Sequence, residues 1–410
     1  RLKTIFANPE LQMVSFTITE KGYALHGADG EFFPFIKSDI ENGPEKATSA
    51  MAVVAALLLE RYKTCKAPLA VVSMDNCSHN GEKLRNSITE MISEWHKKGY
   101  VDEEFVNYVN DESQVSFPWS MIDKITPRPA DSVAQSLKEA GIENMDAVIT
   151  SKRTYIAPFV NAEGPQYLVI EDRFPNGRPQ LEKAGVYMTD RDTVNKVERM
   201  KVTTCLNPLH TALAVYGCIL GYDLIADEMK DKELAELVRR IGLVEGMPVV
   251  TDPKILSPEK FADEVLNVRI PNPFMPDTPQ RIATDTSQKV GIRYGETIKS
   301  YVAKDGSAKA LTAIPLAIAG WCRYLLAVDD NGESFELSAD PMADELKAQV
   351  AGIKVGEPSS YNGQLKNLLS NANIFGINLY EAGIGDKIEE MFVEEIAEKG
   401  AVRETLKKYL

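Results

Sequence analysis

The chain has 410 residues, 44% of them hydrophobic and 26% charged, and a formal net charge of −14. These values are typical of a globular protein with room for two or three domains, and the acidic charge disfavours a nucleic-acid partner or an anionic membrane surface. No apolar run reaches about 18 residues, so no membrane span is predicted. Five cysteines without a CxxC pair indicate reduced thiols in a cytoplasmic protein, and four histidines without a ligand cluster predict no metal site.

The first part of the chain alternates strands and helices. Residues 11–19 alternate as in a strand, 47–64 form an apolar helix pattern, 68–74 are typical of a buried parallel strand, and 82–98 are again helical. The polar stretch 75–81 (DNCSHNG) directly follows the buried strand. Since α/β sheets bind ligands where strands end, this stretch is either a ligand loop or a plain turn of turn-forming residues.

The middle of the chain is extended and rich in proline. Residues 115–129 contain Asp123 in apolar company, beside Ile122 and Ile125. That carboxylate is either a structural ion-pair partner or a ligand contact, and the residues leave both readings open. Residues 166–187 indicate a strand, a turn at 175–177 and a loop.

Long helices dominate after about residue 193, so we predict an α/β domain at 1–192 and a mostly helical domain at 193–410. The predicted helices span 208–229, 231–241, 257–267, 308–326, 341–351 and 386–399, with Ser257 as an N-cap and Pro258 at the first helical position. The sequence shows no internal repeat.

The stretch 201–221 carries the strongest candidate chemistry. Lys201 opens it, and Asn207 and His210 follow three residues apart, so they share one face of a helix whose next residues are apolar. Polar groups at the start of a buried helix are costly unless they are used. The alternative is a satisfied core histidine beside a helix-start asparagine. Further on, Arg281 and Lys289 lie in a polar, proline-rich stretch and are either ligand contacts or solvated surface charges.

Six stretches in order resemble the polyol-specific long-chain dehydrogenases, the mannitol dehydrogenase and fructuronate reductase family. They are SFTITEKGY (15–23), SMDNCSHNG (73–81), VSFPWSMIDKITP (115–127), LVIEDRFPNGRP (168–179), KVTTCLNPLHTALAVYG (201–217) and RIPNPFMPDTPQRIATDTSQK (269–289). The resemblance covers nearly the whole chain. It implies a Rossmann-like N-terminal domain, a helical C-terminal domain, and metal-independent oxidoreductase activity with NAD as cofactor.

The resemblance also implies roles for single residues. Lys201 matches the general acid/base, and Asn207 and His210 match the groups that hold the substrate oxygen at the reacting carbon. The substrate contacts that the resemblance implies are Asn76, Asp123, Arg281 and Lys289. The cofactor contacts that it implies are Lys21, Asp75, Asn76, Ile122 and Asp123.

The chain departs from the family pattern at two places. Five residues separate Lys201 from Asn207 where the family has four, and one extra residue rotates a helical side chain by about 100°. Either a local bulge absorbs it or the lysine enters from the preceding loop. The family's Gly-x-Gly-x-Phe nucleotide loop is also not found, and Gly383-Ile384-Gly385 is no match for it. We therefore expect the first βαβ unit to be missing from this sequence.

The amino-acid sequence of the 207–217 motif most resembles that of the bacterial fructuronate reductases. We therefore expect interconversion of D-fructuronate and D-mannonate by a monomer or small homo-oligomer acting on a small-molecule substrate. The alternatives are a mannitol 2-dehydrogenase, a tagaturonate reductase and, more remotely, a non-catalytic relative without cofactor. A carboxylate would suit Arg281, which can bind it through two hydrogen bonds.

Overall fold

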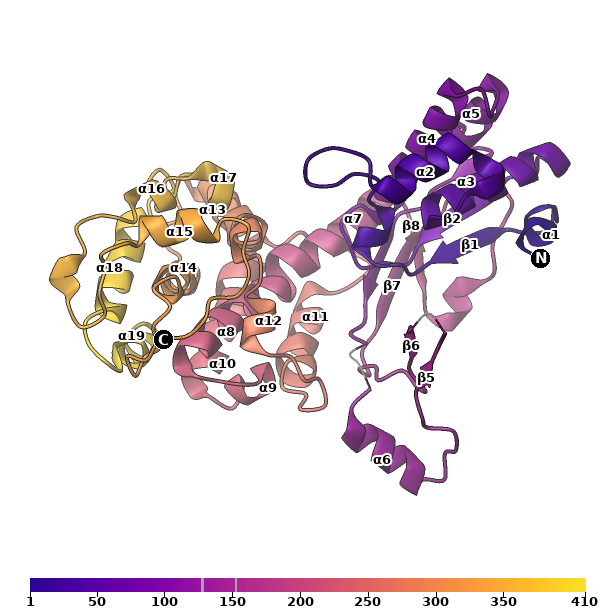
Figure 1. The fold of residues 1–410 in the computed structure, drawn as a ribbon. Helices are drawn as coiled ribbons and strands as arrows, with labels where there is room; N and C mark the ends of the chain where they lie inside the picture. Colours follow the sequence, from indigo (N-terminus) through magenta and orange to yellow (C-terminus); the bar gives the residue numbers. More distant parts are fainter. Residues whose placement is uncertain (127–128, 152) are drawn as a thin grey trace. The chain divides into compact units, whose positions relative to one another are not determined.

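The structure is a computed structural model that describes residues 1–126, 129–151 and 153–410 (Figure 1). Pro127 and Arg128, which belong to the predicted extended stretch 115–129, lie outside the described residues. The described chain forms two compact units: residues 1–124 with 164–198, and residues 125–163 with 199–410. No helix in the described part is long and apolar enough to cross a membrane. The predicted division at residue 192 stays a prediction.

The first unit contains two three-stranded sheets. Its elements are α1 (Leu2–Phe6), β1 (Met13–Phe16), α2 (Pro34–Asn42), α3 (Ala50–Thr64), β2 (Leu69–Ser73), α4 (Asn80–Lys97), α5 (Glu103–Asn110), β3 (Val115–Ser116), β4 (Ser120–Asp123), β7 (Tyr167–Glu171), β8 (Tyr187–Thr189) and most of α7 (Arg191–Met200). Strands β1, β2 and β3 are parallel in that order, with Met13 opposite Ala70 and Leu69 opposite Val115. In the second sheet β4 pairs antiparallel with β7, and β7 pairs parallel with β8.

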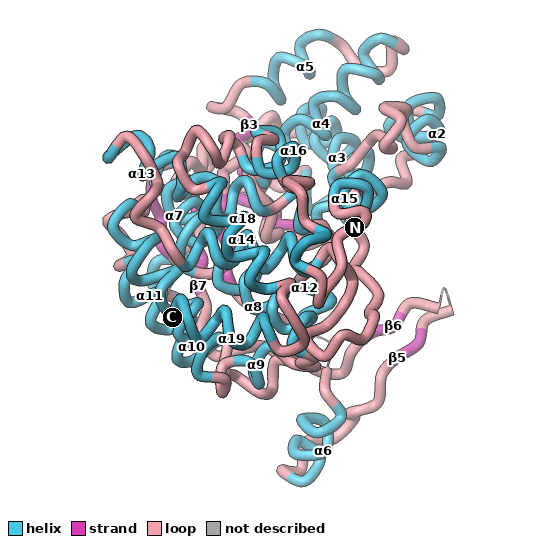
Figure 2. Tube along the Cα trace, turned by 90° about the vertical axis from the view of Figure 1, so that its left-hand side faces the viewer, coloured by secondary structure: helices cyan, strands magenta, loops and turns pink. Residues whose placement is uncertain are grey.

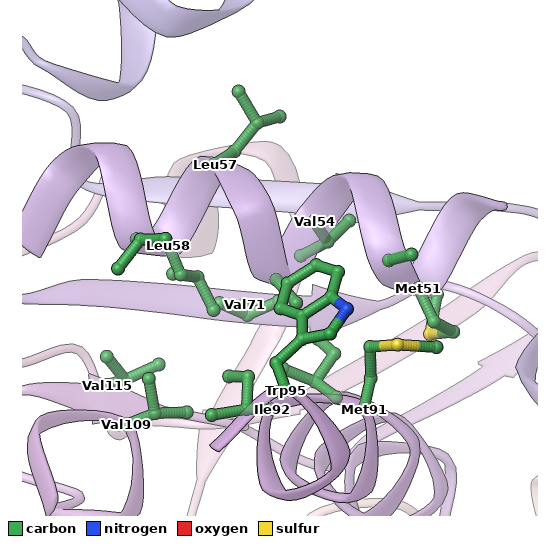
Figure 3. Packing of buried hydrophobic residues seen from close by; sticks show 14 of the residues in the cluster. Met51, Val54, Leu57, Leu58, Val71, Met91, Ile92, Trp95, Val109 and Val115 are labelled. Atoms are coloured by element: carbon green, nitrogen blue, oxygen red, sulfur yellow. The ribbon is translucent and has the colours of Figure 1, made fainter. Parts of the chain in front are cut away.

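The core of this unit forms where helices α3 and α4 cover β2. All five residues of β2 are buried, as expected for a central parallel strand. Figure 3 shows Trp95 of α4 between Val54 of α3 and Ile92, beside Val71 of β2. The Trp95 indole N–H donates to the Asp39 carbonyl at 3.0 Å, so this large ring is buried without an unpaired donor.

The second unit is mostly helical. Its elements are α6 (Asp131–Glu139), β5 (Val148–Ile149), β6 (Tyr155–Ile156), α8 (Asn207–Leu220), α9 (Ile225–Glu228), α10 (Lys232–Arg239), α11 (Pro258–Glu264), α12 (Pro279–Ile282), α13 (Glu296–Asp305), α14 (Ala313–Tyr324), α15 (Ala343–Gln349), α16 (Lys366–Leu369), α17 (Ala372–Phe375), α18 (Gly385–Glu395) and α19 (Ala401–Tyr409). Strands β5 and β6 form a small antiparallel pair.

Helices α8 and α14 form the centre of the second unit, and α18 packs against α14 (Figure 2). Every residue of α14 is buried. A Cβ on Gly320 would lie 2.5 Å from the Tyr216 ring, so the glycine lets the two helices approach closely. The Tyr216 hydroxyl donates to the Leu316 carbonyl at 2.8 Å and also lies 2.7 Å from Oε1 of the Glu395 carboxyl.

Several predicted helices are shorter in the structure, for identifiable reasons. The predicted helix 208–229 is wrong as one element, because Gly221 adopts a left-handed conformation (φ 77°) that ends α8, and α9 starts separately. The helices predicted at 231–241 and 257–267 both pass into π-helical turns, at Arg240–Gly246 and Val265–Arg269. The Ser257 cap is confirmed, since its hydroxyl accepts the Lys260 N–H at 3.2 Å.

Candidate active site

A π-helical turn at Lys201–Cys205 joins α7 to α8. The Leu206 N–H donates to the Lys201 carbonyl at 3.1 Å, which is the i→i+5 bond of a π-helix. A π-turn holds one more residue than an α-turn. The extra residue between Lys201 and Asn207 is therefore absorbed by a local bulge, the first of the two alternatives, and Lys201 continues directly from α7, while the non-helical Leu206 separates this turn from α8.

The three central candidates lie around this turn and the start of α8. Lys201 is only 3% exposed although it carries an ammonium group. Asn207 is the first residue of α8, and its side-chain Oδ1 is buried and accepts no hydrogen bond from any described residue. An unsatisfied buried acceptor costs about 1–3 kcal/mol, so this oxygen needs an explanation beyond packing.

His210 lines a small pocket within the second unit. The other lining residues share no sequence neighbourhood: they are Ile125, Leu206, Ile225, Arg269, Ile270, Met275 and Asp277. The pKa of His210 is lowered to about 4: burial is the largest cause, Asp277 opposes it, and the charges of Arg293, Arg269 and Arg281 add to the lowering. The imidazole is therefore neutral at pH 7, and one ring nitrogen can donate a hydrogen bond while the other accepts.

A buried ion pair forms one wall of the His210 pocket. Arg269 donates through Nε to Glu163 Oε2 at 3.0 Å and through Nη2 to Oε1 at 2.8 Å, and both side chains are 1% exposed. Glu163 Oε1 also accepts the Ile125 N–H at 2.7 Å, and the Glu163 N–H donates to the Ile125 carbonyl at 3.1 Å. Glu163 thus fixes two pocket residues, Ile125 and Arg269.

The predicted cations Arg281 and Lys289 belong to the same neighbourhood but differ in their surroundings. Arg281 is largely exposed and forms an ion pair with Asp277, a residue of the pocket wall. Lys289 donates to the Thr284 carbonyl. Burial, followed by the nearby Arg293, lowers the pKa of Lys289. Both cations therefore have protein partners, and Arg281 also acts electrostatically on His210.

In the first unit, Asp75 joins two of the sequence motifs. Its carboxylate accepts the Ile18 N–H at 3.0 Å, the Thr19 N–H at 2.8 Å and the Tyr23 hydroxyl. The residues after β1 are thereby fixed to the residues after β2, at the carboxyl ends of two adjacent parallel strands. The Asp75 carboxylate therefore holds together the two loops that follow β1 and β2.

The remaining predicted residues of the first unit differ in exposure. Asn76 and Lys21 are exposed, Ile122 is half-buried, and Asp123 is buried at the end of β4. Asn80, which the sequence analysis did not single out, bonds to the Ser73 and Asp75 carbonyls and to Ser120. It links the end of β2 to the start of β4.

Two family models match the chain. The one described as the mannitol dehydrogenase Rossmann domain matches residues 2–183, and the one described as the mannitol dehydrogenase C-terminal domain matches residues 193–397. The D-mannonate oxidoreductase of Thermotoga maritima is 54% identical over 411 residues, covering 100% of this chain and 76% of that protein. The chain belongs to the mannitol dehydrogenase family.

Solved structures of similar proteins agree with this assignment. A D-sorbitol dehydrogenase in substrate-free form has a TM-score of 0.77 and 26% identity over 98% of this chain and 76% of that one. The Pseudomonas fluorescens mannitol 2-dehydrogenase, in a ternary complex with NAD and D-mannitol, has a TM-score of 0.65 and 27% identity over 99% of this chain and 76% of that one. The predicted fold class, a Rossmann-like domain followed by a helical domain, is confirmed, and so is the oxidoreductase class.

For this mannitol dehydrogenase family member, sequence reasoning missed the charged groups that surround His210. Glu163 and Arg269 lie 106 positions apart in the chain, so no local pattern could pair them. Asp277 lies inside the 269–289 motif and Arg293 just beyond it, but the sequence does not distinguish them there from the other charged residues. The only sequence feature that could have indicated Asp277 and Arg293 was the concentration of charged residues in and just after that motif.

Proposed function

We propose that this chain is an NAD-dependent oxidoreductase that interconverts D-fructuronate and D-mannonate. The observation that carries the proposal is the set of polar groups around the start of α8: an unsatisfied Asn207 oxygen, a neutral His210 and, in the π-turn just before the helix, a buried Lys201. Such a concentration of costly polar groups fits a site that binds a polar, oxygen-rich ligand. The choice of D-mannonate is supported by the 54% identity to a D-mannonate oxidoreductase.

The first unit fits a dinucleotide. In open α/β sheets a dinucleotide binds outside the carboxyl ends of parallel strands, and the exposed Lys21 and Asn76 follow β1 and β2 at those ends. Asp75 holds the two loops together there. When bound, the reduced cofactor supplies a hydride to the carbonyl carbon of the substrate.

The residues of the second unit supply the proton and hold the oxygen. In the reducing direction the Lys201 ammonium gives its proton to the oxygen of the forming alkoxide, so a ketone, a hydride and a proton make a secondary alcohol. The Asn207 amide and the neutral His210 imidazole donate hydrogen bonds to that oxygen and stabilise its developing charge. The unsatisfied Asn207 Oδ1 accepts from a substrate hydroxyl or from the lysine ammonium.

The substrate carboxylate faces a set of cations in this proposal. Arg269, Arg281 and Arg293 all act on the electrostatics of His210, and Lys289 lies near two of them. Arg281 and Lys289 contact the more distant substrate oxygens. A neutral polyol has no carboxylate, so these cations would gain no anionic partner from it.

The test is oxidation of NADH by the full-length protein, followed at 340 nm, with fructuronate and fructose offered separately. We expect fast turnover of fructuronate and little of fructose. The reverse result would make the protein a mannitol-type dehydrogenase. Turnover with NADPH in place of NADH would contradict the cofactor assignment. No binding of either cofactor would overturn the oxidoreductase proposal for this chain.

A further inference from the structure

Three side chains from one short segment hold the helical stretch that carries the candidate catalytic residues. The segment comprises the π-helical turn Gly291–Gly295 and the start of α13. The Arg293 guanidinium donates to Thr211 Oγ1, the Tyr294 hydroxyl donates to the Pro208 carbonyl at 3.0 Å, and Thr297 Oγ1 donates to the Thr203 carbonyl at 3.3 Å. These contacts reach the π-helical turn Lys201–Cys205 and the start of α8.

The Arg293 contact continues to the backbone of Asn207. Thr211 is buried, and its hydroxyl donates to the Asn207 carbonyl at 3.0 Å while it accepts from Arg293. The hydroxyl therefore uses its single proton toward Asn207 and a lone pair toward the guanidinium. In such a chain each hydrogen bond polarises the next, so the arginine strengthens the bond that fixes Asn207.

The first turn of α8 needs this support because its own capping is weak. Leu206, which precedes the helix, provides no side-chain cap, and Pro208 has no N–H. The turn also starts directly after a π-turn, where the hydrogen-bond pattern changes. Asn207 and His210 thus lie in the turn of α8 that is stabilised least by hydrogen bonds within the helix.

Arg293 also differs electrostatically from the other arginines near His210. Arg269 is paired with Glu163 and Arg281 with Asp277, whereas Arg293 forms no ion pair with any carboxylate in the described part of the chain. Burial lowers the pKa of Arg293 to about 10, so it stays charged at neutral pH. A desolvated, unpaired guanidinium is expensive, which indicates that its charge is used.

We propose that Arg293 is a positioning residue: it fixes Asn207 through Thr211 and places an unpaired positive charge in the surroundings of His210. This inference rests on the proposed function. The charged groups that act on His210 are Arg269 before α12, Asp277 and Arg281 at α12, and Arg293. Arg293 is the one among them whose charge no carboxylate offsets.

The segment that carries Arg293 is packed closely against α17. A Cβ on Gly291 would lie 2.5 Å from the Ile374 carbonyl oxygen, and one on Gly295 would lie 1.8 Å from that of Phe375. The glycines therefore allow the turn to sit directly on the backbone of α17. Close packing of this kind suits a positioning residue, whose own place must be fixed by its surroundings.

The experiment compares Arg293→Met, Arg293→Lys and Thr211→Val with the wild-type full-length protein. The first readout is the NMR titration of the histidine side chains, of which the chain has four, with the His210 signal assigned by its loss in His210→Asn. The second is kcat and KM for fructuronate as a function of pH. Arg239→Met is the matched control, because Arg239 pairs with Glu236 and its side chain is about half-exposed.

We expect Arg293→Met to raise the titration midpoint of His210 and to move the acidic limb of kcat/KM to higher pH, because a positive charge that opposes protonation is gone. In the same variant kcat should fall by roughly 10- to 100-fold with little change in KM. Arg293→Lys should restore the midpoint. Thr211→Val should lower kcat while leaving the midpoint unchanged, and Arg239→Met should change neither.

An unchanged His210 midpoint together with near-normal kcat in Arg293→Met would overturn the inference. A rise of the midpoint in Arg239→Met would also overturn it, since the effect would then be one of net charge. A wild-type protein that reduces neither fructuronate nor fructose would refute the proposed function instead, and the NMR titration would still decide the link between Arg293 and His210.

Discussion

The buried pair of Glu163 and Arg269 gives the sharpest stability prediction. Both side chains are 1% exposed, and Glu163 accepts two hydrogen bonds from Arg269 and one from the Ile125 N–H at 2.7 Å. Glu163→Ala leaves a buried guanidinium and a backbone N–H without these acceptors. Removing one partner of a buried ion pair typically costs about 3–5 kcal/mol, so we expect a loss of that size in the free energy of unfolding. Glu163→Gln should cost less, because its amide oxygen can still accept from Ile125.

The assay is urea denaturation followed by far-UV circular dichroism at 222 nm, which reports mainly on the helical unit. The double variant Glu163→Leu with Arg269→Met should recover part of the loss, since neither charge of the pair is then left buried. Glu357→Gln, at an exposed pair with Lys354, serves as the control and should leave the unfolding curve unchanged. A loss of less than about 1 kcal/mol in Glu163→Ala would refute the reasoning that this pair is desolvated and structural.

Three further predictions concern single residues of the second unit. Lys201→Ala should lower kcat at least about 100-fold while NADH affinity, measured by fluorescence titration, stays nearly intact; near-normal turnover would exclude Lys201 as the acid/base. Gly295→Ala should lower the melting temperature and kcat together, because its Cβ would meet the Phe375 carbonyl oxygen at 1.8 Å, whereas Gly164→Ala, with no atom within 4 Å, should not. Burial raises the pKa of Glu228 to about 10, so the folded state keeps its proton and stability falls as pH rises between the unfolded value near 4.5 and 10. Glu228→Gln should therefore gain more in melting temperature at pH 9 than at pH 5, and an equal gain at both would contradict the assignment.

The sequence by itself determined the local elements and the family. Alternation and apolar runs located β2, α3 and α4 to within a few residues, because burial imposes a period of two or 3.6 on the side chains. The hydroxyl-and-proline signal placed the start of α11 at the right residue. The order of six short motifs identified the mannitol dehydrogenase family, because they follow one another in the family's order over nearly the whole chain.

Only the tertiary structure decided how the groups around His210 are arranged. The five residues between Lys201 and Asn207 are compatible with two backbone paths. The structure shows the π-turn Lys201–Cys205, and the segment that carries Arg293 packs against it through the hydrogen bond from Thr297 to the Thr203 carbonyl. The pairing of Glu163 with Arg269, and of Arg293 with Thr211, joins residues 106 and 82 positions apart. Contacts at such separations leave no periodic trace in the sequence, because they depend on how whole helices pack. The protonation state of His210 depends on the same packing, since burial and the surrounding arginines set its pKa.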